Sequence, residues 1–227
     1  MNETLTVGAV GAALAGAVGA TVGLAIPAAV VGAANGAMSG ARRVYDWTSP
    51  TGMLAFTLDS TWALGTTTAG LFAHAAGAVR GDPGFDATLS ERQNRHVYAR
   101  GFQPRRGFAI TLGNVVNGAG DTTRPRRARL VTDHEDVHVW QARWLGPVYP
   151  VLYLGWMAGG AIVGVLAWGL RWRHRPLSKM VESYAYYLNP FEWWAYSRDA
   201  HWPPAGKVPG VGWRRPAVRS FRRHEAS

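Results

Sequence analysis

Long uncharged stretches alternate with short polar ones along this chain. Residues 4–41 and 144–170 contain no charged side chain, and residues 47–79 contain only Asp59. Apolar runs of this length favour helices that lie in a membrane or in a protein core. The pattern therefore predicts a mainly α-helical protein with membrane helices.

Small residues recur at every fourth position in two series within the first of these stretches, Gly11, Ala15, Gly19 and Gly23, then Gly32, Gly36 and Gly40. This spacing lines one helix face and lets another helix backbone approach closely. Because about 20 residues cross the hydrocarbon core, the run exceeds one span and Pro27 is expected to divide it. We predict a glycine-zipper membrane segment over 1–43, a helix or a hairpin, with a flexible linker as the alternative.

The middle of the chain is a connecting region over 44–106 that is partly apolar. Residues 56–62 fit a strand or a helix equally well, and residues 80–106 have the composition of a soluble loop and a short helix. Residues 107–116 predict one or two short strands at the edge of a sheet. The expected fold class is thus mainly α with a small β element.

Aromatic residues gather near the last apolar stretch, since nine of the eleven tryptophans lie between Trp140 and Trp213. Tryptophan prefers the headgroup level of a membrane, although an aromatic soluble core is an alternative. After Pro203 the chain is rich in Pro, Gly and Arg. This composition predicts a basic disordered tail over 203–227 that contacts anionic lipid.

Charge and composition narrow the class of protein. The chain has a net charge of +10 and no cysteine, which excludes disulfide scaffolds and cysteine-ligated zinc. Basic residues follow the first and last apolar stretches, at Arg42, Arg43, Arg171, Arg173, Arg175 and Lys179. We therefore predict membrane lipid as a partner, at a bacterial inner membrane, with self-association through the glycine zipper. No nucleic-acid-binding motif is visible, so nucleic acid is not expected.

The candidate chemistry lies in the motif His134-Glu135-Asp136-Val137-His138, followed by Gln141. On a helix, His134 and His138 share one face and can bind one Zn²⁺, while Glu135 can take a proton from water. A third ligand is needed downstream. Glu192 is the candidate because Asn189 can cap a helix that begins with Pro190. The competing ligands are Glu182, Asp199 and His201.

These motifs resemble the gluzincin branch of zinc metallopeptidases, and most closely uncharacterised bacterial HExxHxxQ proteins with an NPxExxA helix. In that resemblance Thr111-Leu112-Gly113 is the strand before the metal helix, and the likeness covers about residues 107–200. It implies that His134, His138 and Glu192 are zinc ligands and that Glu135 is the general base. The implied function is zinc-dependent peptide hydrolysis on a peptide or protein substrate.

Two observations support a different interpretation. Zincins keep the residues between Glu135 and His138 uncharged, whereas this chain has Asp136, which leaves a metal-free form open. Thr132 with Glu135, and Asn189 with Glu192, also fit capping boxes. The alternative is a non-catalytic glycine-zipper membrane protein that oligomerises, with Glu135 acting as a helix cap.

A zinc site also restricts the path of residues 144–170. A single membrane crossing would separate His138 from Glu192 by about 30 Å. The stretch is then a hairpin that turns at Gly159-Gly160 or a helix buried against the domain, or else the site lies within the membrane. We expect the hairpin or an in-plane arrangement, within a zincin-like unit over 107–202. Arg95, His96 and Tyr196 are candidates to orient a substrate or are packing residues, and His74 is expected to be structural.

Overall fold

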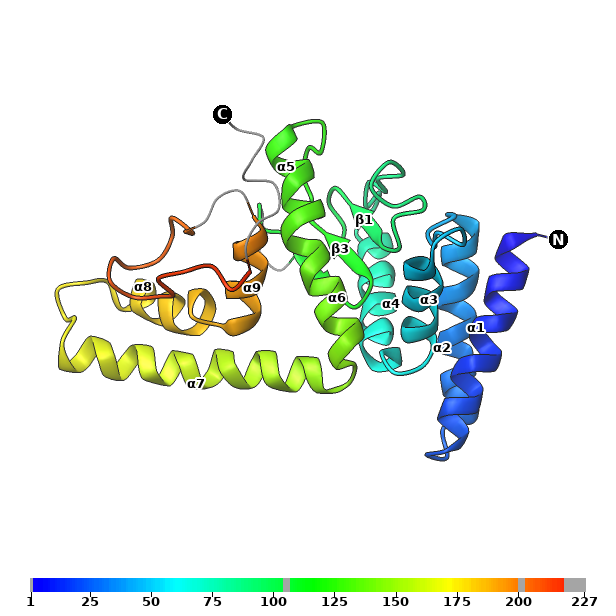
Figure 1. The fold of residues 1–227 in the computed structure, drawn as a ribbon, viewed down its shortest axis with the longest axis horizontal. Helices are drawn as coiled ribbons and strands as arrows, with labels where there is room; N and C mark the ends of the chain where they lie inside the picture. Colours follow the sequence, from blue (N-terminus) through cyan, green and yellow to red (C-terminus); the bar gives the residue numbers. More distant parts are fainter. Residues whose placement is uncertain (1, 104–106, 200–202, 219–227) are drawn as a thin grey trace. The chain divides into compact units, whose positions relative to one another are not determined.

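The computed structural model describes residues 2–103, 107–199 and 203–218, and the chain forms two compact units, Met1–Pro147 and Val148–Ser227 (Figure 1). The described chain is mainly helical with one small three-stranded sheet. The expected fold class is confirmed to this extent. The division differs from the predicted domains, because the N-terminal segment and the HExxH helix share one unit and the segment 107–202 is divided after Pro147.

The first unit begins with an antiparallel pair of helices, α1 (Glu3–Ala20) and α2 (Ala25–Ala41). The chain reverses at Gly23, whose φ of +75° is a conformation that suits glycine. Pro27 lies in the first turn of α2, where its missing N–H removes no helical hydrogen bond. The expected interruption is present, but it precedes Pro27.

Glycines let the backbones of α1 and α2 touch. A Cβ atom on Gly32 would lie 2.2 Å from the Gly11 carbonyl oxygen, and one on Gly36 would lie 2.3 Å from that of Val7. No side chain larger than hydrogen fits at either position. The small-residue faces of the two helices therefore pack against each other within the chain, while self-association of copies stays a prediction.

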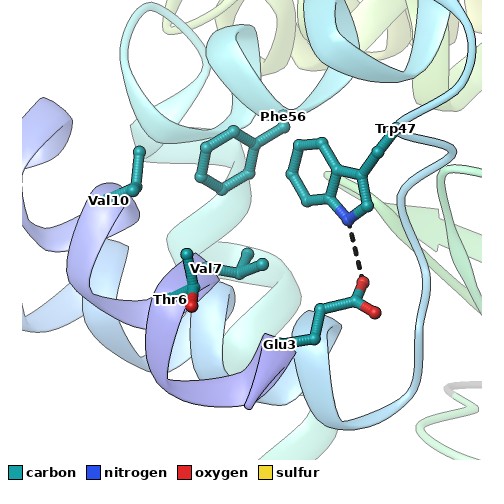
Figure 2. A pocket seen from close by; sticks show the side chains of 6 residues that line it. All are labelled: Glu3, Thr6, Val7, Val10, Trp47 and Phe56. Carbon is teal, nitrogen blue, oxygen red and sulfur yellow. Dashed lines mark hydrogen bonds between the residues drawn. The ribbon is translucent and has the colours of Figure 1, made fainter. Parts of the chain in front are cut away.

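The base of this hairpin is fixed by polar contacts beside a small pocket. Glu3 accepts hydrogen bonds from both terminal nitrogens of Arg92, at 2.7 and 2.8 Å, and one from Trp47 Nε1 at 2.8 Å. Figure 2 shows Glu3 and Trp47 at one end of the pocket, which has a volume of 350 Å³ and apolar walls formed by Val7, Val10 and Phe56.

Two further helices, α3 (Pro50–Ser60) and α4 (Leu64–Val79), follow in the same unit. The Ser49 side chain caps α3 by accepting a hydrogen bond from the Gly52 amide at 3.1 Å, and Pro50 occupies the first helical position. The ambiguous run 56–62 is therefore the end of a helix and the turn after it.

The sheet contains β1 (His96–Tyr98), β2 (Ile110–Leu112) and β3 (Val115–Asn117) in the order β1-β3-β2. β1 is parallel to β3, and β2 is antiparallel to β3. β2 lies at one edge of the sheet, as the sequence predicts, and β1 lies at the other. β1 was not expected. Three residues are too few to show a period, and β1 forms because Val97 packs in a core with Val116, Val131 and Val139.

The second unit begins with α7 (Val148–Leu170), a single continuous helix. The predicted hairpin at Gly159-Gly160 is therefore wrong. The chain returns along this helix through α8 (Leu177–Glu182) and the π-helix η2 (Ser183–Tyr187) to α9 (Pro190–Arg198). Gly160 does not form a turn but lets the returning segment pack closely against α7, because a Cβ there would lie 2.5 Å from the Tyr184 carbonyl oxygen.

Residues 203–218 pack against the second unit. Val208 and Val211 are buried, and the ring of Trp213 stacks on that of Trp193 with centroids 4.0 Å apart. The predicted disorder does not hold for this part of the tail. Residues 219–227, where the same prediction applies, lie outside the described residues.

Two of the described helices are long and apolar enough to cross a membrane. These are α1, with a mean hydropathy of 1.4, and α7, with a mean hydropathy of 1.7. A core helix of a soluble protein and a signal sequence have the same length and composition.

Two histidines lie in the core of the first unit. His74 Nδ1 is 2.6 Å from the Tyr98 hydroxyl, and His96 Nε2 is 3.0 Å from the Ser39 hydroxyl. Burial, with a contribution from the positive charge of Arg42, lowers the pKa of His74 to about 3. Burial also holds the pKa of His96 well below its usual range. Both side chains have contacts within the core, which agrees with the structural role expected of His74.

The close contact of α1 and α2 predicts a specific sensitivity to substitution. We expect Gly32→Ala to lower the free energy of unfolding by about 1–3 kcal/mol, because the added methyl overlaps the Gly11 carbonyl. Gly65→Ala is the matched control, since a Cβ at Gly65 of α4 meets no atom within 4 Å, and it should leave stability unchanged or raise it by up to about 1 kcal/mol through helix propensity. Thermal unfolding in mild detergent measures both. Equal effects of the two substitutions would contradict the packing.

The buried histidines predict acid sensitivity of the first unit. Their folded pKa values lie below the unfolded value, so the unfolded state binds more protons and stability falls as pH drops below about 6.5. Each histidine should remove about 2 kcal/mol between pH 7 and pH 5. Denaturant unfolding at the two pH values measures this loss, and His74→Gln should reduce it. An identical pH dependence in wild type and variant would show that His74 titrates normally in the folded protein.

Candidate metal centre

The HExxH residues lie inside one uninterrupted run of helix. It begins with α5 (Pro125–Arg129), continues through the π-helix η1 (Leu130–Glu135) and ends with α6 (Asp136–Leu145). Thr132 and Glu135 are therefore not at a helix start, and the Thr132 hydroxyl bonds to Asp133 instead. The predicted capping box at Glu135 is wrong. π-Helical turns are rare in proteins, and those that occur often lie at functional sites.

His134 and His138 face each other one turn apart and are buried. Their Nε2 atoms are 3.3 Å apart. The other ring nitrogen of His138, Nδ1, is 2.9 Å from Gln141 Oε1, which is an acceptor. Nδ1 must then carry the proton, so Nε2 presents its lone pair toward His134. Gln141 thus fixes the tautomer in which His138 can bind a metal through Nε2.

Glu135 is held by the edge strand. Its Oε2 accepts a hydrogen bond of 2.7 Å from the hydroxyl of Thr111 in β2, and the carboxylate is 5% exposed. The strand and the helix therefore fix the direction of this side chain together.

Asp136, the residue that departs from the zincin pattern, is paired. Arg95 donates a hydrogen bond of 2.6 Å to Asp136 Oδ1, and the Arg95 side chain is 7% exposed. The charge of Asp136 is therefore balanced by a buried cation in the same unit. Arg95 is accordingly engaged with a carboxylate of the motif, and its role toward a substrate stays a prediction.

In the second unit, Glu192 lies in the first turn of α9. Asn189 accepts a hydrogen bond from the Phe191 amide at 3.0 Å and Pro190 is the first helical residue, as the sequence predicts. The Asn189 amide donates to the Tyr186 carbonyl, so Glu192 does not complete a capping box. Instead, Glu192 Oε1 accepts a hydrogen bond of 2.7 Å from the Tyr153 hydroxyl.

The hydrogen bond from Tyr153 to Glu192 also shows where the chain returns after α7. Tyr153 lies near the start of α7, so the segment after α7 brings Glu192 back to the end at which that helix begins. Two more tyrosines, Tyr186 and Tyr196, lie beside the carboxylate. Burial raises the pKa of both hydroxyls, and the negative charge of Glu192 adds to the shift. These tyrosines are therefore neutral hydrogen-bonding groups near neutral pH.

His134, His138 and Glu192 are all buried, and one potential ligand atom from each lies within 4.8 Å of the others. They are close enough to bind one metal ion. Of the competing ligands, Glu182 pairs with Lys179 at 2.7 Å and Asp199 ends α9. His201 lies outside the described residues.

The histidine geometry fits zinc. Two ligands on bonds of 2.0–2.1 Å at a tetrahedral angle are about 3.3–3.4 Å apart, which is the separation of the two Nε2 atoms. Two imidazoles and one carboxylate are also a common donor set of catalytic zinc. The residues present thus fit the metal that the sequence suggests, while other divalent metals accept the same donors.

Comparison of this chain with known protein families, curated proteins and solved structures finds no match. The gluzincin resemblance therefore rests on the motifs alone and stays a prediction.

Several partners of the site residues were not assigned from the sequence. Gln141 and Thr111 stand in recognised motifs, but only the folded chain shows that they contact His138 and Glu135. Tyr153 lies in an apolar run with no local signal for a polar contact. Of the remaining candidates, His96 belongs to the buried core of the first unit and Tyr196 lies beside Glu192.

Proposed function

We propose that this chain is a membrane-associated zinc-dependent metallopeptidase. The observation that carries the proposal is the group of His134, His138 and Glu192, whose donor types and proximity suit one zinc ion, with Glu135 next to the first ligand. The proposal covers the identity of the metal, the hydrolysis of a peptide bond and the association with a membrane.

Each protein residue has a distinct part in this proposal. Bound zinc would polarise the scissile carbonyl and lower the pKa of a water molecule. His134, His138 and Glu192 hold the metal through two nitrogens and one carboxylate oxygen. Glu135 takes the proton from the attacking water through Oε1 and passes it to the leaving amine. Zinc therefore supplies the charge, and Glu135 moves the proton.

Two neighbours position these groups. Thr111 holds one oxygen of Glu135, which leaves the other oxygen for proton transfer. Gln141 keeps the proton of His138 on Nδ1 and so keeps Nε2 available to the metal. Loss of such supporting contacts commonly lowers metal affinity or activity by about 10–100-fold.

The membrane part of the proposal concerns α7. Its exposed apolar side chains include Val151, Leu154, Ile162 and Leu166. The returning segment beside α7 carries the ion pair of Lys179 and Glu182, which is partly exposed. An upright crossing would draw these charges into the hydrocarbon, which is unfavourable. We propose instead that α7 lies in the plane of the interface.

Zinc content tests the proposed centre. We expect about one zinc per chain in protein purified in mild detergent, and loss of most of it in His138→Ala, because one of three ligands is removed. Glu135→Gln should keep the metal and lose peptide hydrolysis. His174→Ala is the matched control, because His174 is exposed and belongs to no metal group in the described chain. Elemental analysis and a peptidase assay give the two readouts.

A folded wild type that contains no zinc would overturn the proposal. Zinc retained in His138→Ala but lost in His174→Ala would place the metal elsewhere. Hydrolysis that survives Glu135→Gln would remove Glu135 from its role and leave the metal site intact.

A further inference from the structure

One end of the first unit carries no exposed charge. We call residues 15–31 the hairpin tip; it comprises the end of α1, the turn and the start of α2. Figure 1 shows the tip projecting beyond the ends of α3 and α4 in the same unit. Its large side chains are apolar and exposed: Val18, Val22, Leu24, Ile26 and Val30.

The two helices of the hairpin tip pack against each other through small residues. In the tip only Ala15, Gly19 and Ala28 are buried, and all three lie where α1 meets α2. Leu14 is the last residue of α1 that packs against the aromatic core around Tyr45 and Phe56. Beyond Leu14, the described part of the first unit therefore leaves the outer face of the tip uncovered.

The backbone amides of the turn are already hydrogen-bonded. The amides of Thr21, Val22, Gly23 and Leu24 donate to carbonyls of Val18, Gly19 and Ala20 at 2.7–3.3 Å. The Thr21 hydroxyl donates to the Val18 carbonyl at 2.7 Å. Hydrocarbon accepts such a turn because the cost of burying unpaired amides is avoided. A protein partner would instead be expected to find polar groups at its interface.

The length of the tip limits how deeply it can enter a bilayer. Residues Ala15–Ala20 form the last part of α1, and six residues at 1.5 Å each extend about 9 Å. The hydrocarbon core is about 30 Å thick, whereas interfacial helices enter by about 5–10 Å. Trp62 lies in the turn between α3 and α4, and Figure 1 shows the adjoining ends of these helices toward the same end of the unit as the tip. Its indole nitrogen donates to the Trp144 carbonyl, and both tryptophans are exposed, which suits the headgroup level.

We propose that the hairpin tip inserts into one leaflet of a lipid bilayer as a wedge and that α1 does not cross the membrane. Both ends of the hairpin then stay on the side of the HExxH helix. Glu3, with its partners Arg92 and Trp47, remains in the polar region at the base. The inference rests on the membrane part of the proposed function and is independent of zinc.

The absence of cysteine makes a site-specific test possible. Val22→Cys places a single thiol in the tip, and Val79→Cys is the matched control, because both valines are exposed and Val79 ends α4 at the other end of the unit. Each thiol is labelled with an environment-sensitive fluorophore in the full chain. The protein is then reconstituted into phosphatidylcholine vesicles. Some vesicles contain lipid with a nitroxide on the acyl chain.

We expect a blue shift at position 22 and quenching by the acyl-chain nitroxide at least about fivefold stronger than at position 79. The unlabelled Val22→Cys thiol should resist a membrane-impermeant maleimide added outside or trapped inside the vesicles. Thermal unfolding and circular dichroism establish that both variants are folded.

Four results would overturn the inference. Reaction of the tip thiol from the opposite side would show that the hairpin crosses the bilayer. A blue shift without lipid quenching would show that protein covers the tip. A fluorophore at position 22 that stays in water while the chain is bound to vesicles would show that another surface contacts the lipid. A chain that does not bind vesicles at all would also remove the membrane part of the proposed function. Zinc content of the same samples reports separately on the metal centre.

Discussion

The buried ion pair of Arg143 and Asp59 fixes the helix that carries the two candidate metal-ligand histidines. Arg143 donates two hydrogen bonds to Asp59 at 2.8 and 2.9 Å, and both side chains are 2% exposed. Tyr45 donates a third bond to the same carboxylate. Removing one partner would leave a buried charge, which costs about 3–5 kcal/mol. The pair therefore holds α6 on α3 in one rotational setting.

The rotational position of α6 determines the directions in which its other side chains point. His138 precedes Arg143 by five residues, which is about 140° around an α-helix. With Arg143 directed into the first unit, His138 faces a different side, where His134 lies beside it. Thr111 and Arg95 then reach Glu135 and Asp136 from the sheet side. The ion pair of Arg143 and the contacts of Glu135 and Asp136 therefore position the helix together.

Close backbone packing through glycine appears in both units. Gly11 and Gly32 bring α1 against α2, while Gly160 and Gly164 bring the returning segment against α7. In the second unit this return places Glu192 beside Tyr153, near the start of α7. A long continuous helix therefore does not keep Glu192 away from the end at which α7 begins, because the chain goes out along α7 and comes back.

The metal-ligand candidates were the most predictable part of the molecule, because HExxH and Asn-Pro-x-Glu each carry local helix signals. The interruption near Pro27 and the edge strand over 110–112 were also predictable. The errors arise where tertiary contacts decide. Gly159-Gly160 suits a turn locally, yet the packing of Gly160 on Tyr184 keeps the helix straight. The helix start at Pro125 overrides the cap signal at Thr132, and core packing makes β1 a strand.

The central claim is that one zinc ion is bound by two imidazoles and the carboxylate of Glu192. X-ray absorption at the zinc edge measures this coordination in the purified protein. The account predicts two histidine nitrogens and oxygen ligands at about 2.0–2.1 Å, and loss of one oxygen ligand or of the metal in Glu192→Gln. A spectrum without histidine, or one that Glu192→Gln leaves unchanged, would contradict it.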